Sequence, residues 1–159
     1  MRTRLLAVPL LLILVSSAIA DTKSEIDAAY TKFNNAIKGK DLKTCMALCT
    51  TDFKWKDKTS TKNRADAEKM LKAQFQLPFT VKKIEHKILS LTEKNGIVTV
   101  GSKSVITATA VNPQTSKTAT IVSTSESVDT WVKKGKVWLI KAVTEKSNST
   151  TVDGKPFAG

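Results

Sequence analysis

The feature that most constrains the fold is a change of pattern at residue 79. From there to residue 144 the chain is rich in Val, Ile and Thr, whose branched or bulky side chains favour strands. Short connections divide this part into four segments, and two connections contain a glycine suited to a hairpin turn. The segments are 79–92, 97–111, 118–132 and 136–144. They predict an antiparallel meander that is bent and bulged, because several segments exceed the usual strand length.

The residues before position 79 predict three helices. Gly39 ends the first helix, Asp41 caps the second, and the third stops before Pro78. A short alternating run at 53–57 predicts a strand between the second and third helices. The first helix is indicated by apolar side chains at helical spacing, namely Ile26, Tyr30, Phe33 and Ile37. The order favours an α+β fold, with three N-terminal helices packed on a curved antiparallel sheet.

Residues 1–20 are typical of a secretory signal peptide. A basic head precedes an apolar run, and small residues ending at Ala20 complete the pattern. The apolar run is shorter than the roughly 18 residues that span a bilayer. We therefore expect a secreted or periplasmic protein, cleaved near Ala20, with no membrane span. The remaining chain divides into a domain over 21–145 and a polar, flexible C-terminal tail over 146–159.

The charge of the chain indicates a basic, solvated surface rather than a specific nucleic-acid site. The formal net charge is +12, and two of those charges, Arg2 and Arg4, leave with the signal peptide. Arg64 is the only other arginine, although flat guanidinium groups are favoured for recognising phosphates and bases. Loose attraction to anionic polymers stays open as an alternative.

Cys45 and Cys49 are the only cysteines, and we expect free, buried thiols. Side chains four residues apart on a helix lie too far from each other for good disulfide geometry. Together with His86, the two cysteines offer three possible zinc ligands. The chain has no second histidine to complete a four-ligand zinc site. The chain has no glycine-rich phosphate loop and no nucleophile elbow. We predict neither a metal nor a cofactor.

Three short motifs together resemble the NTF2-like superfamily and, within it, the SnoaL-like and DUF4440-type domains. The motifs are Gly39–Asp41 between two helices, Thr51–Trp55 at the first strand and Asp129–Trp138 at the last hairpin. The resemblance implies a cone in which a bent sheet wraps the long helix and leaves an apolar pocket at its open end. It also implies homodimers formed through the exposed sheet face. Because the superfamily includes both enzymes and binding proteins, function has to be argued from the site.

Ketosteroid isomerase-like members of this superfamily need a carboxylate base and two donors to an enolate oxygen. Carried over by the resemblance, the base falls on Asp57. The tyrosine donor falls on Phe33 and the acid donor on Ser127, so only the base is retained. We therefore do not expect that mechanism here. Asp129 and Glu126 could each point inward, but the default expectation is an exposed sheet face, opposite the many lysines.

Two other polar residues are candidates for the site. His86 shares strand parity with two isoleucines and is expected to face inward, as a core histidine or as an acid–base group. Tyr30 lies one turn before Phe33 and could place a hydroxyl in the pocket. The tryptophans are expected mainly to fill space. The predicted pocket is lined by Tyr30, Phe33, Trp55, Asp57, His86, Ser127 and Trp138.

The sequence favours an exported domain without enzymatic activity. It would bind a small apolar or amphipathic ligand, or serve as an interaction module. The alternative is a divergent isomerase or lyase that uses Asp57 or His86 as the base and Tyr30 as a donor.

Overall fold

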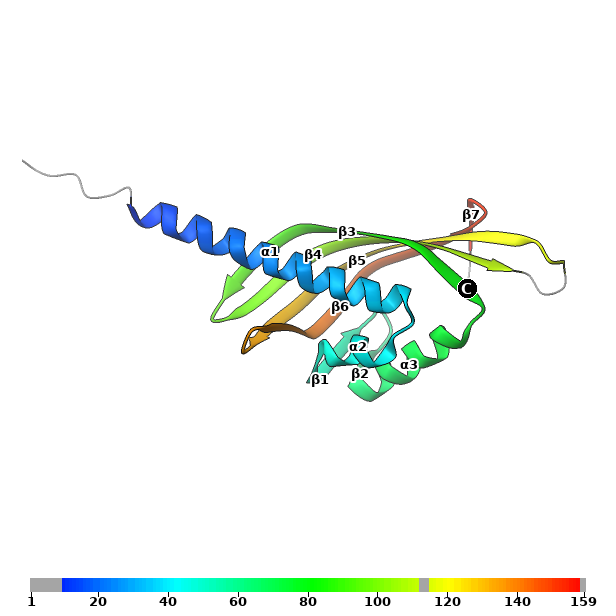
Figure 1. Cartoon of the computed structure of the whole chain (residues 1–159), viewed down its shortest axis with the longest axis horizontal. Helices are drawn as coiled ribbons and strands as arrows, with labels where there is room; N and C mark the ends of the chain where they lie inside the picture. The colour runs from blue at the N-terminus through cyan, green and yellow to red at the C-terminus, as the bar shows by residue number, and fades with distance from the viewer. Residues whose placement is uncertain (1–9, 112–114, 158–159) are drawn as a thin grey trace, which may run out of the picture.

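The structure is a computed structural model that describes residues 10–111 and 115–157, with side chains from Ala20 onward (Figure 1). One long helix lies against a large curved sheet, and two shorter helices sit beside its C-terminal end. The elements in chain order are α1 (Leu10–Lys38), α2 (Leu42–Ala47), β1 (Cys49–Lys56), β2 (Thr61–Asn63), α3 (Arg64–Gln76), β3 (Phe79–Lys94), β4 (Ile97–Val111), β5 (Thr118–Lys134), β6 (Val137–Val152) and β7 (Lys155–Pro156).

The sheet is mixed, with the strand order β2-β1-β6-β5-β4-β3 and β7 paired to β6. Strands β3 to β6 form the predicted antiparallel meander. The prediction of a wholly antiparallel sheet is wrong at β1, which runs parallel to β6 with Lys54 opposite Ala142. The chain enters β1 directly from α2, and that entry sets its direction. The fold class is therefore α+β with a curved mixed sheet.

The meander is bulged, as its strand lengths predict. Register shifts interrupt the pairing of β3 with β4 and of β5 with β6, and such shifts increase local twist and bending. Gly101 lies beside one of them, where an added Cβ would stand 2.5 Å from the Ser90 Oγ. Asn95 and Gly96 both have positive φ, which fits the predicted tight hairpin between β3 and β4.

The three predicted helices form, but they differ from the prediction in size and placement. Helix α2 has only six residues, and α3 follows two strands, β1 and β2, where the sequence predicted one strand. The Asp41 side chain caps α2 by accepting from the Thr44 backbone N–H at 3.0 Å. Two of the three helices are therefore long, and only α1 and α2 precede the sheet.

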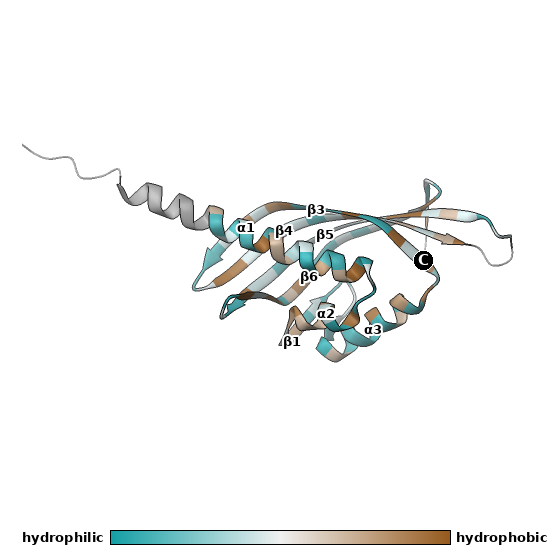
Figure 2. Ribbon diagram, in the orientation of Figure 1, coloured by the Kyte–Doolittle hydropathy of each residue, from teal (hydrophilic) through white to brown (hydrophobic). Residues whose placement is uncertain are grey.

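Two hydrophobic clusters hold the layers together. In Figure 2, apolar and polar residues alternate along the long strands, so that one face of the sheet can pack on α1. The first cluster joins α1 and α3 to the sheet through Ile26, Tyr30, Cys49, Phe53, Ala67, Val98, Val100, Trp131, Trp138 and Ile140. The second joins the three helices through Ala36, Cys45, Met46 and Leu71.

The two cysteines are free and buried, as predicted. They do not share a helix, because Cys45 lies in α2 and Cys49 begins β1. Burial raises the pKa of Cys45 to about 12 and that of Cys49 to about 11. Both therefore stay protonated at neutral pH and act as small apolar residues.

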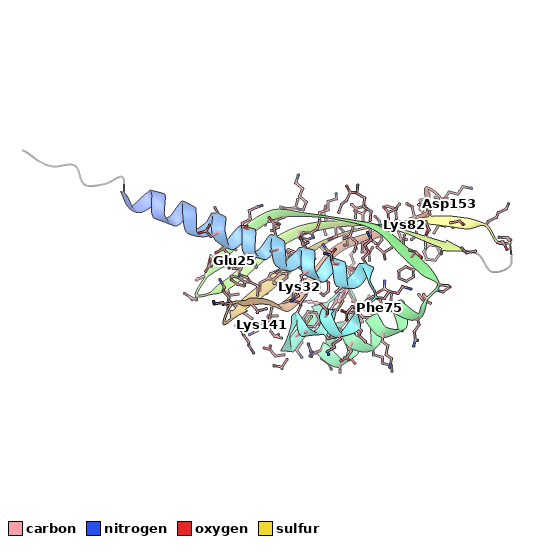
Figure 3. All side chains as sticks on the ribbon, viewed as in Figure 1. Glu25, Lys32, Phe75, Lys82, Lys141 and Asp153 are labelled. Atoms are coloured by element: carbon pink, nitrogen blue, oxygen red, sulfur yellow. The ribbon has the colours of Figure 1, made fainter. Side chains whose placement is uncertain are left out.

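Residues 146–152, assigned from sequence to a flexible tail, continue strand β6 instead. Strand β5 supplies their partners, with Ser123 opposite Thr150 and Ile121 opposite Val152. Asp153, labelled in Figure 3, and Gly154 have positive φ and turn the chain into β7. Polar, serine-rich strands carry little hydrophobic periodicity, which is why the sequence did not indicate this extension.

Helix α1 begins at Leu10 and runs through Ala20 without a break. Within the described part of the chain, no helix is both long and apolar enough to cross a membrane.

Arg64 has a structural role at the start of α3. Its Nη1 donates to the backbone carbonyls of Met46 at 2.7 Å and Cys49 at 3.1 Å. These carbonyls lie where α2 ends and β1 begins, so one guanidinium ties three elements together. This use of Arg64 differs from the phosphate recognition for which arginine is favoured.

We expect Arg64→Met to lower the free energy of unfolding by about 2 kcal/mol, because charge-assisted bonds to partly buried carbonyls are lost. Urea denaturation measures this change. Lys69→Met on the exposed face of α3 is the matched control, with an expected change within about 0.5 kcal/mol. Equal losses in the two variants would contradict the structural role.

Candidate functional site

The centre of the molecule holds a tyrosine and an aspartate in direct contact. Tyr30 lies on the inward stripe of α1, and Asp129 lies on β5 beside Trp131. The Tyr30 hydroxyl donates to the Asp129 Oδ2 at 2.5 Å, and the Trp131 Nε1 donates to the Tyr30 hydroxyl at 3.2 Å. Tyr30 is 6% exposed and Asp129 4%, so this contact is almost completely removed from water.

Two serines extend the contact across the sheet. The Ser102 Oγ donates to the same Asp129 Oδ2 at 3.2 Å, and lies 3.1 Å from the Ser127 Oγ. The other carboxyl oxygen, Oδ1, is buried and has no partner among the described residues. A buried polar atom without a partner costs about 1–3 kcal/mol, so it needs a bound group, a water or a function to explain it.

Burial makes both groups hold their protons more tightly. It raises the pKa of the Asp129 carboxyl, although hydrogen bonds from Tyr30, Ser127 and Ser102 oppose the shift. It also raises the pKa of Tyr30, and the neighbouring carboxylate adds to that effect. A phenol, and a carboxylic acid in its protonated form, can both donate hydrogen bonds to a third oxygen.

His86 completes the cluster from β3. Its ring packs on Tyr30 with centroids 3.8 Å apart and an interplanar angle of 32°. Its Nδ1 lies 3.0 Å from the Ser104 Oγ, while its Nε2 is buried and unpartnered in the described structure. Burial lowers the pKa of His86, so the imidazole is neutral at neutral pH. A neutral imidazole has one nitrogen that can accept a proton.

The structure brings three of the predicted pocket residues together and separates the others. Tyr30, His86 and Ser127 belong to the cluster. Phe33 and Trp55 pack, partly buried, around the first hydrophobic cluster. Trp138 is buried near the β5–β6 hairpin. Its Nε1 donates to the Oε2 of Glu25 at 2.7 Å, and Glu25 is labelled in Figure 3.

Asp57 has a structural role in a turn between β1 and β2. Its Oδ1 accepts from the backbone N–H groups of Thr59 at 2.8 Å and Ser60 at 2.7 Å, and its Oδ2 pairs with Lys62. The bond from Lys62 and the bonds from Thr59 and Ser60 hold the pKa of this carboxyl well below its usual range. A carboxylate stabilised in this way is a weak base, and its contacts stay inside the turn.

Sequence reasoning missed Asp129, and the tyrosine–aspartate contact lies near, but not at, the two positions to which the resemblance pointed. The resemblance put the tyrosine on Phe33, whereas Tyr30 one turn earlier points into the sheet. It put the acid on Ser127, whereas Asp129 two residues later shares that face of β5 and is buried. The expectation that Asp129 lies on an exposed sheet face is therefore wrong. Its alternation with Ser127 and Trp131 was the available signal.

Two surface depressions lie outside the cluster. One, of about 550 Å³, lies between α1 and the start of α2 and is bordered by Lys32, Asn35 and Thr44. The other, of about 340 Å³, lies between β1 and α3. Neither is lined by Tyr30, His86 or Asp129. Within residues 10–111 and 115–157, no group of three or more His, Cys, Asp or Glu side chains could hold a metal ion.

Comparison with known proteins identifies the fold. No protein-family model matches the sequence, and no curated protein is detectably similar to it. Among solved structures, an NTF2-like protein from Cytophaga hutchinsonii is 12% identical and has a TM-score of 0.58, covering 79% of this chain and 97% of its own. A ketosteroid isomerase-like protein from Erwinia carotovora atroseptica is 15% identical and has a TM-score of 0.56. The match covers 78% of this chain and 95% of that protein.

A third similar structure is that of a protein of unknown function from Mycobacterium tuberculosis. It is 14% identical with a TM-score of 0.63, covering 83% of this chain and 74% of its own. Identities this low establish the fold alone. The chain has the NTF2-like superfamily fold.

The raised pKa of Asp129 leads to a pH-dependent prediction. A carboxyl whose pKa is raised by folding stabilises the protein below its unfolded pKa, about 3.9, and that contribution is lost as the pH rises through the folded value. An amide oxygen in the place of Oδ2 can accept from both Tyr30 and Ser102 without ionising. We therefore expect Asp129→Asn to gain stability relative to the wild type as the pH rises from about 4 to 8.

Chemical denaturation at a series of pH values measures this difference. The exposed Asp21→Asn is the control, and its difference from the wild type should not follow the same trend. A stability difference between Asp129→Asn and the wild type that is constant over this pH range would contradict a raised pKa.

Proposed function

We propose that this NTF2-like domain binds a small, largely apolar molecule through a carbonyl or phenolic oxygen held by Tyr30 and Asp129. The observation that carries the proposal is a buried carboxyl group with one unpartnered oxygen, in contact with a tyrosine hydroxyl. Without a bound molecule, this arrangement costs stability. When a ligand oxygen enters, the bond between Tyr30 and Asp129 would open, and that oxygen would accept from the Tyr30 hydroxyl and from the protonated carboxyl group at Oδ1.

The environment of the pair favours such a ligand. Hydrogen bonds are stronger where water is excluded, and developing negative charge on the ligand oxygen strengthens them further. The apolar part of the ligand would contact partly buried side chains that pack around the first cluster, namely Phe33, Trp55, Ile88, Leu91 and Val143. The likeness to a ketosteroid isomerase-like protein agrees with this proposal but does not carry it.

The proposal predicts that Tyr30→Phe weakens binding of 2-naphthol, a fluorescent phenol that offers one oxygen on an apolar body. Loss of a buried donor should raise the Kd about 10-fold, in keeping with about 1–2 kcal/mol for one hydrogen bond. Fluorescence titration measures the Kd, and circular dichroism checks that the variant is folded.

Asp57→Asn is the control for this experiment. We expect it to leave the Kd for 2-naphthol within about twofold, because the partners of Asp57 among the described residues all lie in the β1–β2 turn and in β2. Unchanged binding in Tyr30→Phe, or an equal loss in Asp57→Asn, would contradict the proposed site.

Acid–base catalysis is the second candidate, and the position of His86 favours it. A neutral imidazole with a free Nε2 packs on the tyrosine that would hold the substrate oxygen. The imidazole could remove a proton from the carbon beside the carbonyl while Tyr30 and Asp129 stabilise the enolate oxygen. It would then return the proton to another carbon of the enolate. This is the isomerase or lyase alternative, with His86 rather than Asp57 as the base.

Isomerisation of 3-cyclohexen-1-one to its conjugated isomer tests this candidate, because the ultraviolet absorbance of the product follows the reaction. His86→Gln should lower the rate at least 100-fold if His86 is the base. The wild-type rate should fall at acid pH as the imidazole is protonated, at a pH below the usual histidine value. A rate that His86→Gln leaves unchanged would leave binding as the function.

Export of the chain, with cleavage near Ala20, is part of the same proposal. Among the side chains that the structure describes, Ile26 is the first that is fully buried. A chain that begins at Asp21 therefore keeps every described core residue.

A further inference from the structure

We infer that the binding site continues along the concave face of the sheet and selects amphipathic molecules that carry hydroxyl groups along one edge, such as glycosides of an aromatic ring. The concave face is the sheet face that carries Asp129 and packs on α1. Its β5 and β6 positions are hydroxyl-rich, and its β3 positions are mostly aliphatic. The inference rests on the proposed function, because the ligand oxygen held by Tyr30 and Asp129 fixes the end of the molecule.

The register of the sheet defines this face. Strands β4 and β5 pair without a shift from Ile97 opposite Val132 to Val111 opposite Thr118. Since side chains alternate between faces, every second residue from Asp129 towards the start of β5 shares its side of the sheet. These residues are Ser127, Ser125 and Ser123, and all three are half-buried.

Hydrogen bonds continue the polar edge onto β6. The Thr150 Oγ1 donates to the Ser123 Oγ at 3.3 Å, and the Ser123 Oγ lies 3.3 Å from the Asn148 Oδ1. Asn148 is opposite Ser125 in the register and bonds to Glu145 at 3.5 Å. Hydroxyl, amide and carboxyl groups therefore lie side by side, with donors and acceptors that a polyhydroxylated ligand could pair with.

The opposite edge of the same face is mostly aliphatic. Along β3 the residues that share it are Leu91, Ile88, Ile84 and Val81, with His86 between them. Val81 is buried, and Ile84, Ile88 and Leu91 are half-buried. This face is thus divided lengthwise, with an apolar side that suits a ring system and a polar side that suits its hydroxyl groups.

The serines depart from what the strand itself favours. On the convex face of β5, every position from Thr118 to Val132 except Glu126 is Val or Thr, which are strong strand formers. Three successive concave positions are serine instead. Such a local departure from propensity is expected at functional sites.

An unpartnered buried group marks the inner end of this polar edge. Asp129 is only 4% exposed, and its Oδ1 has no partner in the described structure. From Asp129 to Ser125 the strand spans about 13 Å, at about 3.3 Å per residue. That length fits a fused aromatic ring joined to one sugar.

The test compares 2-naphthol with 6-hydroxy-2-naphthyl β-D-glucoside, which has the same phenol and an added sugar. We expect the glucoside to bind the wild type at least fivefold more tightly. The double variant Ser123→Ala with Ser125→Ala should remove this advantage and leave the Kd of 2-naphthol unchanged. Thr124→Ala, on the convex face between the two serines, is the matched control and should retain the advantage.

The outcomes separate this inference from the proposed function. If 2-naphthol binds through Tyr30 but the glucoside gains nothing, the selection for hydroxyl groups is wrong and the binding site stands. If the serine variant and Thr124→Ala lose the advantage equally, the concave serines are not responsible and the inference is also wrong. If neither compound binds, both proposals fail.

Discussion

The hydrogen bond between Tyr30 and Asp129 joins the long helix to the centre of the sheet, and the interior is built around it. Ile26, Val98, Val100 and Trp131 surround the pair and are almost fully buried, so water cannot solvate the carboxyl group. The carboxyl group therefore depends on Tyr30 and Ser102 for its contacts. An apolar pair of similar size would avoid the cost of its unpartnered oxygen. Retaining a carboxyl group here is easier to explain by function than by stability.

Much of the fold could be predicted from local patterns. The long strands, the hairpins with glycine and the amphipathic α1 all follow from periodicity and turn chemistry, which act over a few residues. The parallel pairing of β1 with β6 joins residues about ninety positions apart, and no local pattern records it. The extension of β6 to Val152 depends on partners supplied by β5, so the polar residues 146–152 gave no signal by themselves.

The candidate site shows the same division. Tyr30 and His86 were predictable because each lies on an apolar periodic face, where a polar group is conspicuous. Asp129 was not, because an acid in an alternating strand fits either face and a basic chain makes the exposed one the default. Asp57 was chosen by its place in the chain, but its contacts with Lys62 and its own turn decide its role. Such contacts are visible only in three dimensions.

The distribution of positive charge agrees with a raised pKa for the buried Asp129 carboxyl. Of the 26 basic residues, 23 are lysines, and many of the acidic side chains at the surface pair with one of them. Glu25, Asp27, Asp52, Asp57, Glu85 and Glu126 all do so. No lysine or arginine is a hydrogen-bond or ion-pair partner of Asp129 in the part of the chain that is described. A single nearby cation would lower the pKa of this carboxyl and keep it charged. Although the chain is rich in lysine, burial is therefore the dominant influence on Asp129, and it raises the pKa of this carboxyl. In its protonated form Asp129 can donate a hydrogen bond to a ligand.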